Sequence, residues 1–129
     1  PEYQMHKAPQ TAAESEPLHF DLPNNDQTNQ VMLNMLDSHD TPRILTLAHG
    51  DEVLALQALT FTFMQTGAPC LYYGTEMGMS GGDDPDDRKP MDWSKLGSPI
   101  WKKVAELVHF RRKHAQTLGQ GSTRMSVTA

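Results

Sequence analysis

Residues 31–43 read VMLNMLDSHDTPR, a largely apolar run that passes directly into a polar cluster. A strand buried on both faces of a sheet has such a continuous apolar pattern, because neither of its faces meets water. The polar cluster at residues 37–42 then lies in the loop at the carboxyl end of this strand. We therefore predict a buried strand over residues 31–36 that ends in a loop rich in ionisable side chains.

A helix and a second strand are predicted to follow. Residues 50–52 (GDE) place two carboxylates where the helix dipole favours negative charge, and residues 53–64 are apolar on nearly all sides. This pattern predicts a largely buried helix. Gly67 and Pro69 end it, and residues 70–73 (CLYY) are typical of a second short strand.

The last predicted element is a helix over residues 98–118. Ser98 suits the N-cap and Pro99 the first turn, and apolar residues then recur at helical spacing. Trp101 is one of them, so we expect it in the core. The basic residues 111–114 (RRKH) are interpreted as a solvated helix end that the dipole favours.

This order of strand, helix, strand, long loop and helix indicates an α/β fold. Parallel neighbouring strands need a crossover helix, so the alternation favours a parallel sheet. In barrels of this kind the chemistry lies on loops at the carboxyl ends of the strands. Two polar clusters, at residues 37–43 and 81–88, lie at these predicted ends.

Composition excludes several classes of protein. The 129 residues carry 11 Lys and Arg against 16 Asp and Glu, a formal net charge of −5, which argues against a nucleic-acid partner. No apolar run approaches the roughly 18 residues that cross a bilayer. The single cysteine, Cys70, excludes an internal disulfide framework and a multi-cysteine zinc cluster. The chain begins with Pro1, so we expect a fragment of a longer protein.

Taken alone, each polar cluster leaves alternatives open. The first, DSHDTPR, is either a site with a tuned carboxylate or a simple turn before Pro42. The second, GGDDPDDR, fits a calcium loop, a sugar-binding loop or a solvated acidic turn. Its glycines precede the acids and no Glu closes a twelve-residue loop, so it misses the EF-hand pattern.

Together the motifs are more specific. Residues 34–43 (NMLDSHDTPR), 67–78 (GAPCLYYGTEMG) and 81–88 resemble the alpha-amylase superfamily, glycoside hydrolase family 13. The likeness is to its neopullulanase, cyclomaltodextrinase and maltogenic amylase branch. It covers about residues 29–118 and implies the C-terminal part of a (β/α)8 TIM barrel. Strand seven, helix seven, strand eight and helix eight would then lie within residues 31–118, after a loop-rich lead-in (1–30) and before a linker to a β-sandwich (119–129).

The resemblance also implies roles for individual residues. Asp40 would be the third catalytic carboxylate, which binds sugar hydroxyls and favours an oxocarbenium-like transition state, and His39 would bond the same ring. Asp84 and Arg88 match a pair that lines a more distant glycone subsite; the alternative is an ion pair that staples the loop. Arg43 is assigned to the substrate-binding region, where orienting the Asp40 loop is the favoured role. Asp87 stands where this branch often has Cys.

The implied nucleophile and acid/base have no matching motif here, so the chain alone is expected to be inactive. The expected partner is a maltooligosaccharide or other alpha-glucan, and the expected location is the cytoplasm. We expect no metal or cofactor in this chain, while the parent enzyme could bind calcium elsewhere. Unpaired barrel edges predict self-association into a homo-oligomer. Two alternatives are a non-catalytic glucan-binding or assembly module and a metal phosphohydrolase using His39 and Asp40.

Overall fold

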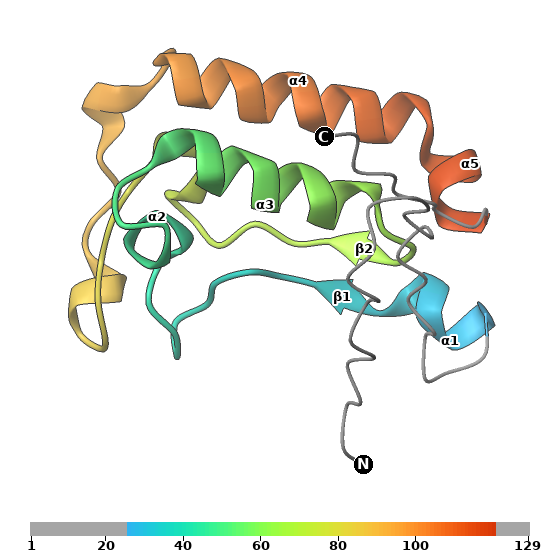
Figure 1. The fold of residues 1–129 in the computed structure, drawn as a ribbon, viewed down its shortest axis with the longest axis horizontal. Coiled ribbons are helices and arrows are strands. Elements are labelled where there is room, and N and C mark those ends of the chain that lie inside the picture. Colours follow the sequence, from blue (N-terminus) through green and yellow to red (C-terminus); the bar gives the residue numbers. More distant parts are fainter. Residues whose placement is uncertain (1–25, 121–129) are drawn as a thin grey trace, which may run out of the picture.

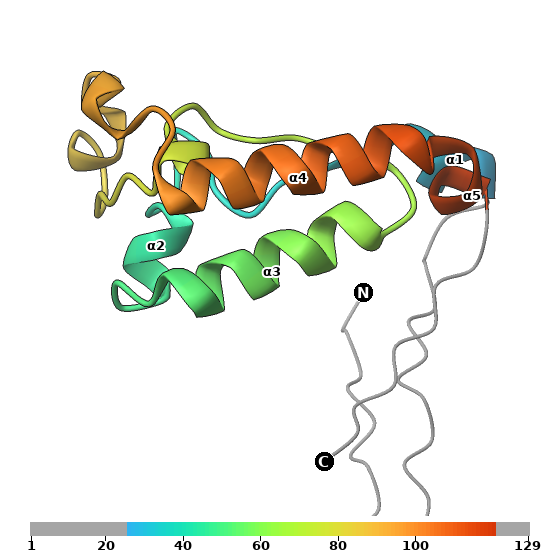
Figure 2. The same cartoon turned by 90° about the horizontal axis from the view of Figure 1, so that it is seen from above.

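The computed structural model describes residues 26–120, in which two long helices lie side by side next to a short pair of strands (Figures 1 and 2). The helices are α3 (Glu52–Met64) and α4 (Pro99–Lys113), and the strands are β1 (Leu33–Asn34) and β2 (Ala68–Pro69). The shorter helices are α1 (Asp26–Val31), α2 (Ile44–Leu47) and α5 (Ala115–Gln120), with single 3-10 turns η1 (Thr75–Met77), η2 (Asp86–Arg88) and η3 (Trp93–Lys95). The expectations for residues 1–25 and 121–129 lie outside the described residues.

The two strands pair in parallel, as the alternation of strands and helices predicted. Leu33 pairs with Ala68, and the ladder continues where the Cys70 amide donates to the Asn34 carbonyl over 2.8 Å. Gly67 makes the close approach possible: its φ is +107°, and a Cβ there would lie 2.7 Å from the Met32 carbonyl oxygen.

The extent and burial of both strands differ from the prediction. The first covers two residues instead of 31–36; Leu33 within it is 62% exposed, and Val31, which ends α1, is 76% exposed. The second lies at residues 68–69, before the predicted 70–73. A strand is buried on both faces only between neighbouring strands and under helices. Within the described part of the chain β1 has one neighbour, β2, so its apolar side chains stay in contact with water.

Helix α3 begins where the acidic pair predicted it. The Asp51 carboxylate caps it by accepting from the amides of Val53 and Leu54, at 2.9 and 3.1 Å. The prediction that this helix is largely buried was wrong. Leu59 and Phe63 are buried, whereas Val53 and Leu54 are 65% and 49% exposed, because α4 and the loops cover one side only.

Helix α4 also begins as predicted, with Ser98 Oγ accepting from the Trp101 amide and Pro99 in the first turn. Its buried residues Ile100 and Val104 pack on Leu59 of α3, and this contact forms the main core. The helix ends at Lys113, and the separate helix α5 follows instead of one continuous helix to residue 118. No helix among residues 26–120 is both long enough and apolar enough to cross a membrane.

Arg111 corrects the interpretation of the basic helix end. Its side chain is 9% exposed, and its guanidinium donates to the carbonyl oxygens of Phe63 (2.8 Å), Gln65 (2.6 Å) and Gly67 (2.5 Å). Burial lowers the pKa of Arg111. The buried cation therefore satisfies carbonyls that the end of α3 leaves without partners, and it fixes the turn that leads into β2.

Candidate functional site

The loops that leave β1 and β2 are joined by a buried carboxylate. Asp37 follows β1, is 4% exposed, and accepts from the Ile44 amide and the Thr75 hydroxyl, both at 2.9 Å. Thr75 lies in η1, beyond β2. The two strand exits are therefore held at a fixed separation by one side chain, a function that sequence reasoning did not assign to Asp37.

A tight turn presents His39 and Asp40 to solvent. The Ser38 amide donates to the Thr41 hydroxyl at 3.0 Å, and the Asp40 amide donates to the Ser38 hydroxyl at 3.1 Å. These local bonds between hydroxyls and backbone stabilise the turn. His39 Nε2 lies 3.2 Å from Asp40 Oδ2, and the two side chains are 59% and 72% exposed.

The loop containing η2 brings Asp84 and Arg88 to the same place. Arg88 Nε lies 3.1 Å from Asp84 Oδ1, and its Nη2 lies 3.7 Å from Asp40 Oδ1. One guanidinium is thus shared between a carboxylate of its own loop and the carboxylate of the first turn. The structure brings together His39, Asp40, Asp84 and Arg88, four of the five residues that the sequence singled out.

Asp86 shapes the loop that carries Arg88. Its carboxylate accepts from the Gly82 amide at 2.7 Å and pairs with the Lys89 ammonium at 2.7 Å. The hydrogen bond from Lys89, followed by that from Gly82, lowers the pKa of Asp86 below its ordinary value of 3.8. The Tyr73 hydroxyl donates to the Lys89 carbonyl at 2.7 Å and ties this loop to the segment after β2.

Arg43, the fifth residue, lies inside the protein. Its side chain is fully buried, its Nη1 donates to the Tyr73 carbonyl at 2.6 Å, and the guanidinium carbon lies 4.7 Å from the ring centres of Tyr72 and Tyr73. A guanidinium over aromatic faces is favourable, more so when it is desolvated. This position agrees with a role in orienting the loop and gives Arg43 no exposed surface for a sugar.

The exposed cluster of two carboxylates, an imidazole and a planar guanidinium offers several hydrogen-bond donors and acceptors in fixed positions. Such a set matches the hydroxyl groups of a sugar, because a guanidinium held by carboxylates presents its remaining N–H groups in one plane. Among residues 26–120 no group of three or more His, Cys, Asp or Glu side chains is placed to hold a metal ion.

Comparison with known proteins identifies a matching family. The family model described as alpha amylase, catalytic domain, matches residues 16–117. The chain belongs to the alpha-amylase family. Its relatives are of the maltogenic amylase and cyclomaltodextrinase branch that the motifs predicted, so the predicted family is confirmed.

Three relatives are much longer than this alpha-amylase family chain. An intracellular maltogenic amylase of Bacillus subtilis is 56% identical over 97 residues, which are 74% of this chain and 16% of the relative. A solved cyclomaltodextrinase matches with a TM-score of 0.68 at 41% identity, over 72% of this chain and 16% of that one. A cyclic alpha-maltosyl-(1→6)-maltose hydrolase from Arthrobacter globiformis, solved with that compound, matches with a TM-score of 0.67 at 35% identity, over 73% and 22%. The chain thus spans about a sixth of the curated relative it matches.

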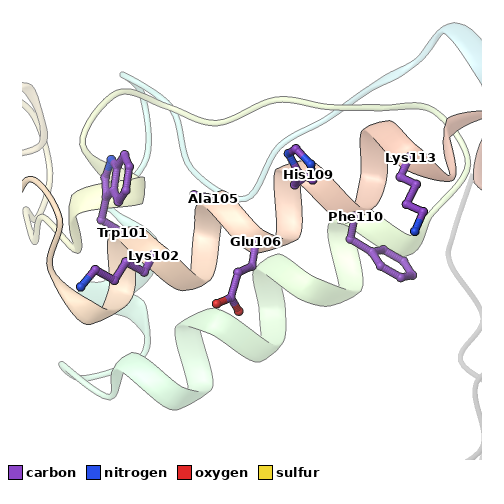
Figure 3. Close-up of a pocket in the computed structure, with 7 residues that line it drawn as sticks. All are labelled: Trp101, Lys102, Ala105, Glu106, His109, Phe110 and Lys113. Atoms are coloured by element: carbon purple, nitrogen blue, oxygen red, sulfur yellow. The ribbon is translucent and has the colours of Figure 1, made fainter.

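A hollow along α4 is lined by seven residues of that helix (Figure 3). Trp101, predicted in the core, is partly exposed and lines this hollow. The other lining residues are Lys102, Ala105, Glu106, His109, Phe110 and Lys113. None of the predicted site residues lines this hollow, so it is distinct from the exposed cluster.

Proposed function

We propose that the chain is part of a retaining alpha-glucan hydrolase and carries the substrate-binding edge of its active site. In this proposal Asp40, with His39, binds the hydroxyls of the sugar ring at the cleavage point and stabilises the transition state. Asp84 and Arg88 bind a sugar further along the glucan. The observation that carries the proposal is the Arg88 guanidinium held between Asp84 and Asp40, at 3.1 and 3.7 Å.

The chemistry requires groups beyond these. A retaining glycosidase uses one carboxylate as nucleophile and a second as acid and base, about 5 to 5.5 Å apart. Asp40 acts beside that pair. Its negative charge stabilises the positive charge that develops on the ring, and its hydrogen bonds favour a distorted sugar. The nucleophile and the acid/base are supplied by other parts of the enzyme, so this chain alone has no hydrolase activity.

The fold and location belong to the same proposal. We place β1 and β2 as strands seven and eight of a (β/α)8 barrel, and α3 and α4 as the helices that follow them. The parallel pairing of Leu33 with Ala68 and the long crossover through α3 support this. We also propose a cytoplasmic location, on the support of the Bacillus subtilis relative that is named intracellular.

The exposed first strand supports self-association. Along residues 31–35, four apolar side chains are 47% to 76% exposed. A strand edge and an apolar face without a partner favour association with another chain. We propose that copies of the isolated chain associate through this surface.

The proposed function is tested by calorimetry with maltotriose and by turnover assays with cyclomaltodextrin, pullulan and a nitrophenyl maltoside. We expect weak maltotriose binding, its loss in Asp84→Ala, and no turnover. Asp83→Ala is the matched control, since Asp83 is an exposed acid of the same loop. Unchanged maltotriose binding in Asp84→Ala would remove the assigned subsite. Turnover that disappears in Asp40→Asn would show that this chain holds a complete catalytic pair.

A further inference from the structure

Two oppositely charged side chains, each close in sequence to the exposed cluster, are buried with some of their polar atoms unpaired among the described residues. Arg43 and Asp87 are both fully buried. Nε and Nη2 of Arg43 and both carboxylate oxygens of Asp87 have no hydrogen-bond partner within residues 26–120. A buried charge without compensation costs several kcal/mol, so a stable fold must satisfy both groups.

The three cations that follow Asp87 in the chain, up to residue 95, are already engaged. Arg88 is shared between Asp84 and Asp40, and Lys89 pairs with Asp86. The Lys95 ammonium, from η3, donates to the Gly78 carbonyl at 3.2 Å. Among the described residues, Arg43 has one such bond, from Nη1 to the Tyr73 carbonyl. Its buried nitrogens Nε and Nη2 therefore remain free to donate, and both oxygens of Asp87 remain free to accept.

The backbones of the two residues meet at Gly81. The Arg43 amide donates to the Gly81 carbonyl at 3.0 Å. On the other side, a Cβ at Gly81 would lie 2.8 Å from Asp87 Cα, which is closer than real side chains come. A single glycine thus separates the segment that follows Asp40 from the segment that precedes Arg88.

Both charges also act on one side chain. Burial raises the pKa of Tyr72 above its ordinary value of 10.0, and neighbouring Tyr73 raises it further. Arg43 lowers the pKa of Tyr72 and Asp87 raises it, so the two charges lie in the surroundings of the same phenol.

We propose that Asp87 is a positioning residue whose carboxylate forms a buried, water-bridged charge pair with the Arg43 guanidinium. The unpaired nitrogens of Arg43 and the unpaired oxygens of Asp87 supply the donors and acceptors that a buried water needs, since such waters make about three hydrogen bonds. The pair connects the Asp40 turn to the Arg88 loop inside the protein and fixes the distance between them. This inference rests on the proposed function, because it assigns the pair to the spacing of the sugar-binding residues.

A double-mutant cycle in the full chain tests the pair, with Asp87→Asn, Arg43→Gln and the double variant followed by thermal unfolding. Each single variant should lower the unfolding midpoint by about 10 °C or more, because it leaves one buried charge alone. The double variant should recover at least half of that loss. Asp83→Asn, an exposed acid of the same loop, should change the midpoint by about 2 °C or less. If the double variant loses the sum of the two single losses in unfolding midpoint, the pair does not exist. The same conclusion follows if both single variants fold and the double variant does not.

Two further measurements separate positioning from general stability. In nitrogen-15 spectra, the Arg43 Nε–H signal, assigned by its loss in Arg43→Gln, should shift in Asp87→Asn and stay in place in Asp83→Asn. Maltotriose affinity, measured well below every unfolding midpoint, should fall several-fold in Asp87→Asn and stay unchanged in Asp83→Asn. Non-additive unfolding midpoints together with unchanged maltotriose affinity in Asp87→Asn would overturn the positioning role. Non-additive midpoints in a chain whose unsubstituted form does not bind maltotriose would support the pair and reject the proposed function.

Discussion

The Thr75 hydroxyl donates a hydrogen bond to the Asp37 carboxylate across 2.9 Å, and both side chains are buried. Asp37 lies three residues after the end of β1, and Thr75 lies six residues after the end of β2. The same oxygen of Asp37 accepts from the Ile44 amide. The exposed residues of the site are therefore held by a buried contact that touches no solvent and no sugar.

Replacing Asp37 by Ala should destabilise the chain strongly. Two buried donors would lose their acceptor, which costs on the order of 3 kcal/mol in the free energy of unfolding. Thr75→Val removes one donor and should cost about 1 kcal/mol. Urea unfolding followed by circular dichroism measures both losses. Asp83→Ala serves as the exposed control, and an Asp37→Ala loss no larger than this control's would contradict the anchoring role.

Arg111→Ala should destabilise the contact between α3 and α4. The substitution leaves the carbonyls of Phe63, Gln65 and Gly67 without their donor, and a hydrogen bond to a charged group contributes a net of about 1.5 to 3 kcal/mol. We expect a net loss of about 3 kcal/mol by urea unfolding. Arg112→Ala, at the exposed neighbouring position, should cost less than about 0.5 kcal/mol. Equal losses at the two positions would show that Arg111 adds only surface charge.

Arg88→Lys should weaken maltotriose binding by about tenfold, although the charge is kept. Lysine cannot place two donors in one plane, so it cannot contact Asp84 and Asp40 as a fork does. Calorimetry at constant pH measures the change. Arg112→Lys is the matched control and should leave the affinity unaltered. Full affinity in Arg88→Lys would mean that only the positive charge at this position matters.

Some of these features were readable in the sequence because their causes are local. The start of α3 at the acidic residues and the Ser98 cap of α4 are decided by neighbouring residues and were predicted correctly, as was the parallel pairing. The convergence of Asp40 with Asp84 and Arg88 followed from placing both motifs at strand ends, aided by the family resemblance.

Other features depend on contacts between distant residues. Arg111 has the local pattern of a solvated helix end, and its burial follows from where the end of α3 lies. Asp37 acquires its role from Thr75, which is 38 residues away. The length and burial of the predicted strand at residues 31–36 depend on neighbouring strands and helices, of which the described residues supply only β2. A sequence pattern reports a preference for burial and does not supply the surface that buries it.

The Asp86 loop should loosen in acid. The pKa of Asp86 is lowered from 3.8, chiefly by the Lys89 hydrogen bond, so the folded loop prefers the ionised carboxylate. Its stabilising contribution is complete above pH 3.8 and is lost as the pH falls through the lower folded value. The Gly82 amide shift, followed by NMR from neutral pH downward, should report the loss. Asp86→Asn should abolish that titration, and a Gly82 shift that titrates above pH 4 would contradict the assignment.

Self-association should depend on the exposed side chains beside β1. Leu33 is 62% exposed on a strand that has one neighbour among the described residues, so burying it against a second copy removes apolar surface from water. We expect light scattering to show an average mass that rises with protein concentration. Leu33→Lys should shift this equilibrium toward the monomer, because a charged side chain on a strand edge opposes pairing. Leu96→Lys, at a position that is 59% exposed after η3, should leave the association unchanged. Equal effects of the two substitutions would place the association surface elsewhere. A monomer at every concentration would show that the chain does not self-associate.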